Sequence, residues 1–183
     1  MPSVPLQTAR SALRVATAEW HDRVDALFSQ VDLGDRAAYG CFLAAQAHAH
    51  LATEDALTRA GADAVLPDWP DRQRAARLRA DLAALQLPLP EVVGAISFDC
   101  AAAVLGGVYV LEGSRLGGRL LRRSVPADLP CSFLDAADPT GWRRLLELME
   151  HRLADEASRE PAIAAARAVF ALFEESGRRH LQA

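Results

Sequence analysis

Apolar residues recur at three- and four-residue steps along most of the chain, which is the period of amphipathic α-helices. The first such stretch predicts a helix over residues 7–30, whose core-facing stripe consists of Leu13, Trp20, Val24, Leu27 and Val31. Gly34 breaks this pattern, and Asp35 is suited to cap a second helix that runs to about residue 60. Gly61 follows and is a residue type that commonly ends helices. The first third of the chain is therefore predicted to form two long helices.

The middle of the chain is punctuated by prolines. Pro67 and Pro70 interrupt the pattern, and Pro70 fits the first turn of a helix. A third helix carries a stripe of leucines and ends before Pro88; the stripe is Leu78, Leu82 and Leu85. A fourth helix is predicted to start near Glu91 and to run into, or stop just before, the glycine-containing helix considered below.

The last third of the chain starts with an irregular, proline-containing stretch at residues 125–139. Two further helices are predicted near residues 140–157 and 160–181, with Pro161 in the first turn of the second. No stretch alternates as a half-buried strand does, and no internal repeat is visible. We therefore expect one all-α domain over residues 1–183, with about seven helices.

One predicted helix, at residues 106–123, contains an unusual amount of glycine. Its apolar stripe starts two residues before this stretch and consists of Val104, Leu105, Val108, Leu111, Leu116 and Leu120. Each interior glycine costs about 1 kcal/mol relative to alanine, so something must offset Gly106, Gly107, Gly113, Gly117 and Gly118. One interpretation is close helix packing, or a helix break at the last two of them. The other is that Gly113 and Gly117, four residues apart, leave a bare strip of backbone that a flat ligand can approach.

Composition narrows the class of protein. The 183 residues are 51% hydrophobic and 24% charged, as in an ordinary globular domain, and the net charge of −4 argues against nucleic-acid binding. Three widely spaced cysteines, Cys41, Cys100 and Cys131, suggest neither a disulfide framework nor a zinc site. The N-terminus has no signal-peptide pattern, and no apolar run is long enough to span a bilayer. We expect a cytoplasmic protein that does not associate with membranes and is a monomer.

Four of the five histidines are not expected to carry chemistry. His48 and His50 are two residues apart on a helix and cannot chelate one metal. His50 with Glu54, and Glu147 with His151, are spaced four apart and are interpreted as surface contacts. His180 follows two arginines near the end of the chain and is expected to be solvated.

His21 differs, because it lies beside the apolar stripe of the first helix with Arg14 seven residues before it and Asp25 four after. Seven residues correspond to about 10 Å of helix rise, the order of the distance between a haem iron and its propionates. A neutral imidazole is a common axial ligand of haem iron, an acid can hold its other nitrogen, and an arginine can bind a propionate. The alternative is a boundary histidine beside an ordinary salt bridge.

Two motifs favour the haem interpretation. Residues 13–21, LRVATAEWH, resemble the haem-ligating helix of haem oxygenases, which has the pattern Leu, basic, any residue, Ala, Thr, three residues, His. Residues 109–118, YVLEGSRLGG, resemble the helix on the opposite, distal side of the haem in bacterial members. A weaker resemblance extends over residues 69–85 and the last helix. The whole chain is most similar to haem oxygenases encoded beside bacterial phytochromes.

This resemblance implies a haem held between the two helices, with His21 ligating the iron, Arg14 facing a propionate and Asp25 near the ligand. It implies that Gly113, Ser114 and Gly117 form the catalytic distal wall. Further haem contacts are implied for Thr17, Tyr109, Gly118 and, as a second propionate partner, Arg143. Mammalian members have an aspartate where this chain has Ser114, and the position of another basic propionate contact matches Glu147.

The implied activity is oxidative cleavage of haem b to biliverdin, CO and ferrous iron, with O₂ and external electrons. We expect the α isomer of biliverdin, and a role in supplying this chromophore to a bacterial phytochrome. The alternative is a non-catalytic haem- or tetrapyrrole-binding protein that keeps the fold.

Two arginine clusters bear on the electron donor, which is expected to be a ferredoxin or a reductase. Part of the first is expected to dock an acidic donor; this cluster is Arg115, Arg119, Arg122 and Arg123. The second is interpreted as a solvated helix face; it is Arg72, Arg74, Arg77 and Arg79.

Overall fold

The computed structural model describes residues 8–91, 96–135 and 138–182, and every regular element within them is helical. The longer helices are α1 (Ala9–Phe28), α2 (Arg36–Arg59), α5 (Ala75–Ala84), α6 (Ala101–Leu121), α7 (Pro139–Arg152) and α8 (Glu156–Leu181). Shorter ones are α3 (Ala62–Val65), α4 (Trp69–Arg72) and the 3₁₀ turn η1 (Arg122–Ser124). The predicted all-α fold is confirmed.

Local sequence explains most helix ends. Thr8, Asp35 and Asp138 accept hydrogen bonds from amides in the first turns of α1, α2 and α7. Gly61 has a left-handed backbone with φ of 75°, which glycine adopts without steric cost, and it follows the end of α2 as predicted. Pro70 lies in the first turn of α4, also as predicted.

Two predicted boundaries are wrong. The helix expected from Glu91 is absent at that residue and at residues 96–100, where the chain is irregular; residues 92–95 of this prediction lie outside the described residues. The helix expected over 140–157 ends at Arg152, because Asp155 and Ser158 form a capping box that begins α8. Pro161 consequently lies inside α8, beyond its first turn.

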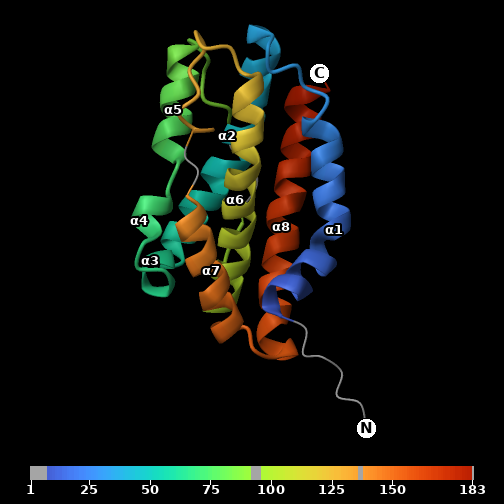
Figure 1. Ribbon diagram of the computed structural model, residues 1–183, viewed down its shortest axis with the longest axis vertical. Helices are drawn as coiled ribbons and strands as arrows, with labels where there is room; N and C mark the ends of the chain where they lie inside the picture. Colours follow the sequence, from blue (N-terminus) through green and yellow to red (C-terminus); the bar gives the residue numbers. More distant parts are fainter. Residues whose placement is uncertain (1–7, 92–95, 136–137, 183) are drawn as a thin grey trace.

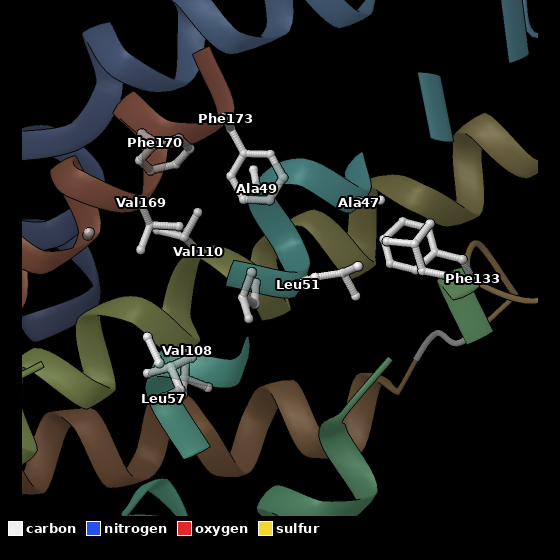
Figure 2. Packing of buried hydrophobic residues seen from close by; sticks show 14 of the residues in the cluster. Ala47, Ala49, Leu51, Leu57, Val108, Val110, Phe133, Val169, Phe170 and Phe173 are labelled. Atoms are coloured by element: carbon white, nitrogen blue, oxygen red, sulfur yellow. The ribbon is translucent and has the colours of Figure 1, made fainter. Parts of the chain in front are cut away.

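Helix α8 is the centre of the fold and packs against α1, α2 and α6 along its length (Figure 1). Figure 2 shows side chains of α2, α6 and α8 pointing into the shared core, among them Leu57, Val108 and Val169. Helix α7 contacts both α1 and α6. At this junction the carboxylate of Glu150 accepts hydrogen bonds from the amides of Ala9 and Arg10, at 2.8 and 3.0 Å, and so caps the start of α1.

Candidate functional site

A cavity of about 460 Å³ is bounded by α1 on one side and α6 on the other. Helices α2, α7 and α8 contribute the remaining walls, with Gln46, Trp142 and Phe170 among their lining residues. The volume is typical of small-molecule and cofactor pockets, and the wall is largely apolar with a few polar groups. The predicted site residues that line it are Arg14, Thr17, His21, Asp25, Tyr109, Gly113, Ser114 and Gly117.

The α1 wall presents a histidine whose two ring nitrogens have different surroundings. Nδ1 of His21 lies 3.2 Å from Oδ2 of Asp25, four residues later on the same helix. Because a carboxylate accepts a hydrogen bond, this contact favours the tautomer with the proton on Nδ1, which leaves the lone pair of Nε2 free. The side chain is 58% exposed and packs edge-on against Phe170 at 5.9 Å between ring centroids. His21 is therefore arranged as a metal ligand would be.

Two other predicted residues of α1 have different environments. The guanidinium of Arg14 lines the cavity and makes no ion pair with any residue that the structure describes, so its charge is available to an anionic ligand. Thr17 is buried, and its hydroxyl donates a hydrogen bond to the carbonyl of Leu13 at 2.8 Å. Thr17 therefore lines the cavity with its hydroxyl donor already used.

The α6 wall separates the glycines into two groups. At Gly113 and Gly117 a methyl group in place of hydrogen would meet no heavy atom within 4 Å, and both residues line the cavity. At Gly106 it would overlap the backbone of Ala162 in α8, and at Gly107 it would press on Phe98. The packing interpretation is therefore correct for Gly106 and Gly107. Gly113 and Gly117 leave open space beside the cavity, and close approach of a flat ligand to them stays a prediction.

Gly118, the third glycine of α6 that is predicted to contact haem, differs from both groups, because a methyl group there would make only ordinary contacts. It is buried, faces Leu134 and does not line the cavity. The helix continues through Gly117 and Gly118 to Leu121, so the break considered for this pair is absent.

Ser114 connects the cavity wall to the interior. Its hydroxyl donates to the carbonyl of Leu111 at 2.7 Å and accepts from the guanidinium of Arg74 at 3.0 Å. Arg74 is buried, and burial together with the neighbouring charge of Arg115 lowers its pKa to about 9, which still leaves it charged at pH 7. The orientation of the Ser114 hydroxyl is thus fixed from behind the wall.

Further buried arginines lie behind α6. Arg72 is 3.0 Å from the carboxylate of Glu112 and also bonds Asp68 at 2.8 Å. Arg115 lies 3.4 Å from Glu112 and donates to the carbonyl of Arg72. The solvated-face interpretation is therefore wrong for Arg72 and Arg74, and Arg115 is not available for docking a partner, because all three are buried.

A second correction concerns His50 and Glu54, which are buried rather than on the surface. Nε2 of His50 lies 2.9 Å from Glu54, whose carboxylate also accepts the amides of Arg74 and Ala75 at the start of α5. Burial, reinforced by the charge of Arg74, lowers the pKa of His50 to about 4. Burial alone would raise the pKa of Glu54, but the hydrogen bonds that it accepts lower it.

The remaining histidine predictions have mixed outcomes. Glu147 and His151 are both exposed, as expected of a surface pair, although the ion pair of Glu147 is with Arg143, at 4.0 Å. His180 is wrongly predicted as solvated. It is half-buried, and its Nε2 lies 3.4 Å from Nδ1 of the fully buried His48.

Tyr109 and Trp142 pack together at 5.6 Å between ring centroids and join α6 to α7 at the cavity. Burial raises the pKa of the Tyr109 hydroxyl, and the positive charges of Arg10 and then Arg14 oppose that rise. Arg143, next to Trp142, is 71% exposed and does not line the cavity. The structure therefore does not bring Arg143 to the site.

Sequence reasoning missed several lining residues, most of them aromatic. Phe28, Phe42, Trp142, Phe170 and Phe173 line the cavity, as does the amide side chain of Gln46. Their helices carry apolar stripes that are equally consistent with an ordinary core, so no local signal separates them from core residues. Only the placement of α1, α2, α7 and α8 relative to one another brings them to one cavity.

Within residues 8–91, 96–135 and 138–182, no group of three or more His, Cys, Asp or Glu side chains is arranged to hold a metal ion by itself. No helix in those ranges is long and apolar enough to cross a membrane. His21 alone supplies too few ligands to bind a free metal ion. It is better suited to bind a metal whose other ligands come from a larger molecule, such as a macrocycle.

Comparisons with known proteins bear on the family and on the fold. No family profile matches the chain. The haem oxygenase of Xanthomonas campestris pv. campestris (strain 8004) is 39% identical over 112 residues, which are 57% of this chain and 67% of that protein. The solved structure of a haem oxygenase from Neisseria meningitidis, described in NO- and CO-bound forms, shares the fold with a TM-score of 0.82. It is 23% identical, and the superposition covers 96% of this chain and 92% of that one. On the similarity to the Xanthomonas protein, and with a histidine and a bare glycine face on opposite walls of one cavity, the chain belongs to the haem oxygenase family.

Proposed function

We propose that the cavity between α1 and α6 binds haem b and that the protein cleaves this substrate oxidatively to biliverdin, CO and ferrous iron. The observation that carries this proposal is that His21 and the bare glycines Gly113 and Gly117 line the same cavity from opposite helices. Haem itself supplies the iron that reacts with O₂ and the macrocycle that is oxidised. The protein supplies position, electrostatics and access.

The α1 residues suit an iron porphyrin with carboxylate side chains. Nε2 of His21 serves as the iron ligand, because Asp25 holds the opposite nitrogen in its protonated form. Arg14 serves as a propionate partner through a charge-assisted hydrogen bond, because no described carboxylate competes for it. Tyr109, across the cavity, presents a hydroxyl that remains protonated at pH 7.

The α6 wall suits self-oxidation of the ligand. Gly113 and Gly117 leave room for a flat molecule to approach the backbone closely, and the open space beside each supports this role. The α6 residues that line the cavity are Tyr109, Val110, Gly113, Ser114, Gly117 and Leu121, none of which is an acid or base near pH 7. Premature proton transfer from a side chain of this wall is thereby avoided.

The product and its use extend this proposal. The backbone of α6 at Gly113 and Gly117 would lie close to one face of the macrocycle and would restrict which of its edges is oxidised. We propose that this edge is the α-meso carbon, which gives the α isomer of biliverdin. The resemblance to haem oxygenases encoded beside bacterial phytochromes supports a role in supplying biliverdin as a phytochrome chromophore.

Electrons must come from a separate donor, and we propose that an acidic ferredoxin or reductase docks at the end of α6. Arg119 and Arg123 are exposed there, and Leu120 between them is 68% exposed. Gly117 and Leu121 of the same turns line the cavity, so this patch adjoins the site. An exposed leucine among arginines offers an acidic partner both apolar and charged contacts.

A haem titration followed by ascorbate in air tests the function. The wild-type protein should bind one haem with the ferric spectrum of a histidine ligand, and ascorbate should convert the bound haem to biliverdin. His21→Ala should lose that ligation while thermal melting of the haem-free protein changes little, because the side chain is exposed. Binding without turnover would instead support the non-catalytic haem carrier. An unchanged spectrum in His21→Ala would refute the ligand assignment.

A further inference from the structure

The cavity presents too few positive charges for the ligand proposed above. Haem carries two propionates, but Arg14 is the one arginine among the lining residues that the structure describes. Asp22 and Asp25 also line the cavity and add negative charge rather than positive. A second cation should therefore reach the site from its rim.

Arg10 is placed at this rim by the helix that carries the predicted iron ligand. It precedes Arg14 by four residues and His21 by eleven, so the three side chains project within a sector of about 40° on α1. The step from Arg14 to Arg10 is roughly 6 Å along the helix axis, within the span of a long arginine side chain. Arg10 is exposed and makes no ion pair with a residue in the described ranges.

The backbone at Arg10 is fixed independently of its side chain. Its amide donates to Oε1 of Glu150 at 3.0 Å, and the amide of Ala9 donates to Oε2 of the same carboxylate at 2.8 Å. This cap holds the first turn of α1 against α7. The carboxylate of Glu150 is thus engaged by backbone and does not need the guanidinium of Arg10.

The electrostatics at Tyr109 agree with this placement. Among the charges that act on the Tyr109 hydroxyl, Arg10 opposes the burial-induced rise of its pKa more strongly than Arg14 does. The positive field of Arg10 therefore reaches the cavity wall at the same group as that of Arg14. Arg143, by contrast, is directed to solvent near Glu147.

We propose that Arg10, together with Arg14 and the Tyr109 hydroxyl, forms the site that binds the propionates of haem, and that Arg10 takes the place expected for Arg143. This inference rests on the proposed haem binding. A flexible arginine at the rim binds a carboxylate without requiring a deeper charge, whose burial would be costly.

The test compares Arg10→Gln with two matched charge-removing variants. Arg143→Gln removes the alternative partner, and Arg36→Gln removes an exposed arginine at the start of α2 that does not line the cavity. Each variant and the wild type are titrated with ferric haem and with its dimethyl ester, in which neither propionate is charged. Thermal melting without haem checks that each variant folds.

We expect Arg10→Gln to bind haem about five- to tenfold more weakly than wild type, as for one partly exposed charge-assisted contact. Its affinity for the dimethyl ester should equal that of wild type, and its spectrum should retain histidine ligation. Arg143→Gln and Arg36→Gln should bind both ligands as wild type does.

Haem affinity of Arg10→Gln equal to that of Arg36→Gln would overturn the proposal, as would an equal loss for the ester. A loss confined to Arg143→Gln would assign the role to Arg143 instead. If wild type itself failed to bind haem, the proposed function would fail, which is a different outcome.

Discussion

Replacing Gly117 by alanine separates a role in ligand binding from a role in helix packing. The position lies in the interior of α6, where glycine is a poor helix former, and a new methyl group would meet no heavy atom within 4 Å. Gly106, on the same helix, provides the matched control. There the same methyl group would overlap the backbone of Ala162, which cannot move aside as a flexible side chain can.

The expected stability changes have opposite signs. Gly117→Ala gains helix propensity and reduces the freedom of the unfolded chain, which should raise the free energy of unfolding by up to about 1 kcal/mol. In a chain of this size that is a rise in Tm of roughly 2–4 °C. Gly106→Ala has the same gain but an overpacking cost near the upper end of the usual 1–3 kcal/mol. Its net effect should be a loss of about 2 kcal/mol.

The variant that gains stability should be the one that loses activity. Gly117→Ala adds a methyl group to the α6 wall and so narrows the cavity. We therefore expect less biliverdin per bound haem, or a changed isomer distribution, although the protein is more stable. Gly106→Ala leaves the cavity wall intact, so its folded fraction should react as wild type does. Thermal melting, haem affinity and single-turnover product analysis measure these effects. Wild-type rates and the wild-type isomer in both Gly117→Ala and Gly113→Ala would refute the assignment of these glycines to the haem wall.

Two further predictions concern ionisable side chains, the buried His50 and the arginines at the end of α6. Because the folded pKa of His50 is about 4, the unfolded chain binds one more proton between pH 6.5 and 4, and stability should fall as pH drops through this window. In urea melts from pH 4 to 7, His50→Gln should reduce this slope, by at most about 1.4 kcal/mol per pH unit; an unchanged slope would contradict the buried neutral imidazole. Arg122→Glu and Arg123→Glu should slow turnover with an acidic ferredoxin and weaken its salt dependence, while ascorbate-driven turnover stays unchanged. Arg122 also bonds Asp135 at 3.1 Å, so Arg123→Glu is the cleaner test, and equal ferredoxin-driven rates at low salt would exclude docking here.

The helices were predictable because their signals are local. A stripe such as Leu78, Leu82 and Leu85, an N-cap such as Asp35 and a stop such as Gly61 each involve residues close in sequence. The boundary near residue 157 was missed although its signal is also local, since the Asp155–Ser158 capping box outweighs the presence of a proline at 161.

Charge burial was not predictable in the same way. Arg72 is charged and 4% exposed because its partner Glu112 comes from a helix forty residues later, and Glu54 is buried because it caps the start of α5. Nothing near these residues in the sequence distinguishes them from a solvated face, since a buried ion pair depends on which helices meet.

The candidate site was partly predictable from the sequence, less so than the helices and more so than the buried charges. His21, Arg14 and Gly113 carry family motifs and could be named in advance, and the structure brings them to one cavity. Their roles toward haem stay predictions. Gly118 belongs to the same motif as Gly113, whereas Arg143 lies outside both motifs. Neither residue lines the cavity, because the rotation of α6 and of α7 directs them away from it.

The arginines behind α6 have a dynamic consequence for a helix so rich in glycine. Arg74 holds the carbonyl of Leu111 and the hydroxyl of Ser114, while Arg115 on the same helix is tied to the backbone of Arg72. Gly113 and Gly117 have no side chains that could hold α6 on its cavity side, but the bonds of Arg74 and Arg115 hold the helix on its other side within the turn that contains Gly113. The backbone amides of this turn of α6 should therefore exchange slowly with deuterated solvent. Their exchange rates should be set by breaking of the Arg74 and Arg115 hydrogen bonds rather than by the local flexibility of glycine. Because Arg74 and Arg115 hold α6 in place, the helix can have glycine rather than side chains at positions 113 and 117 beside the cavity.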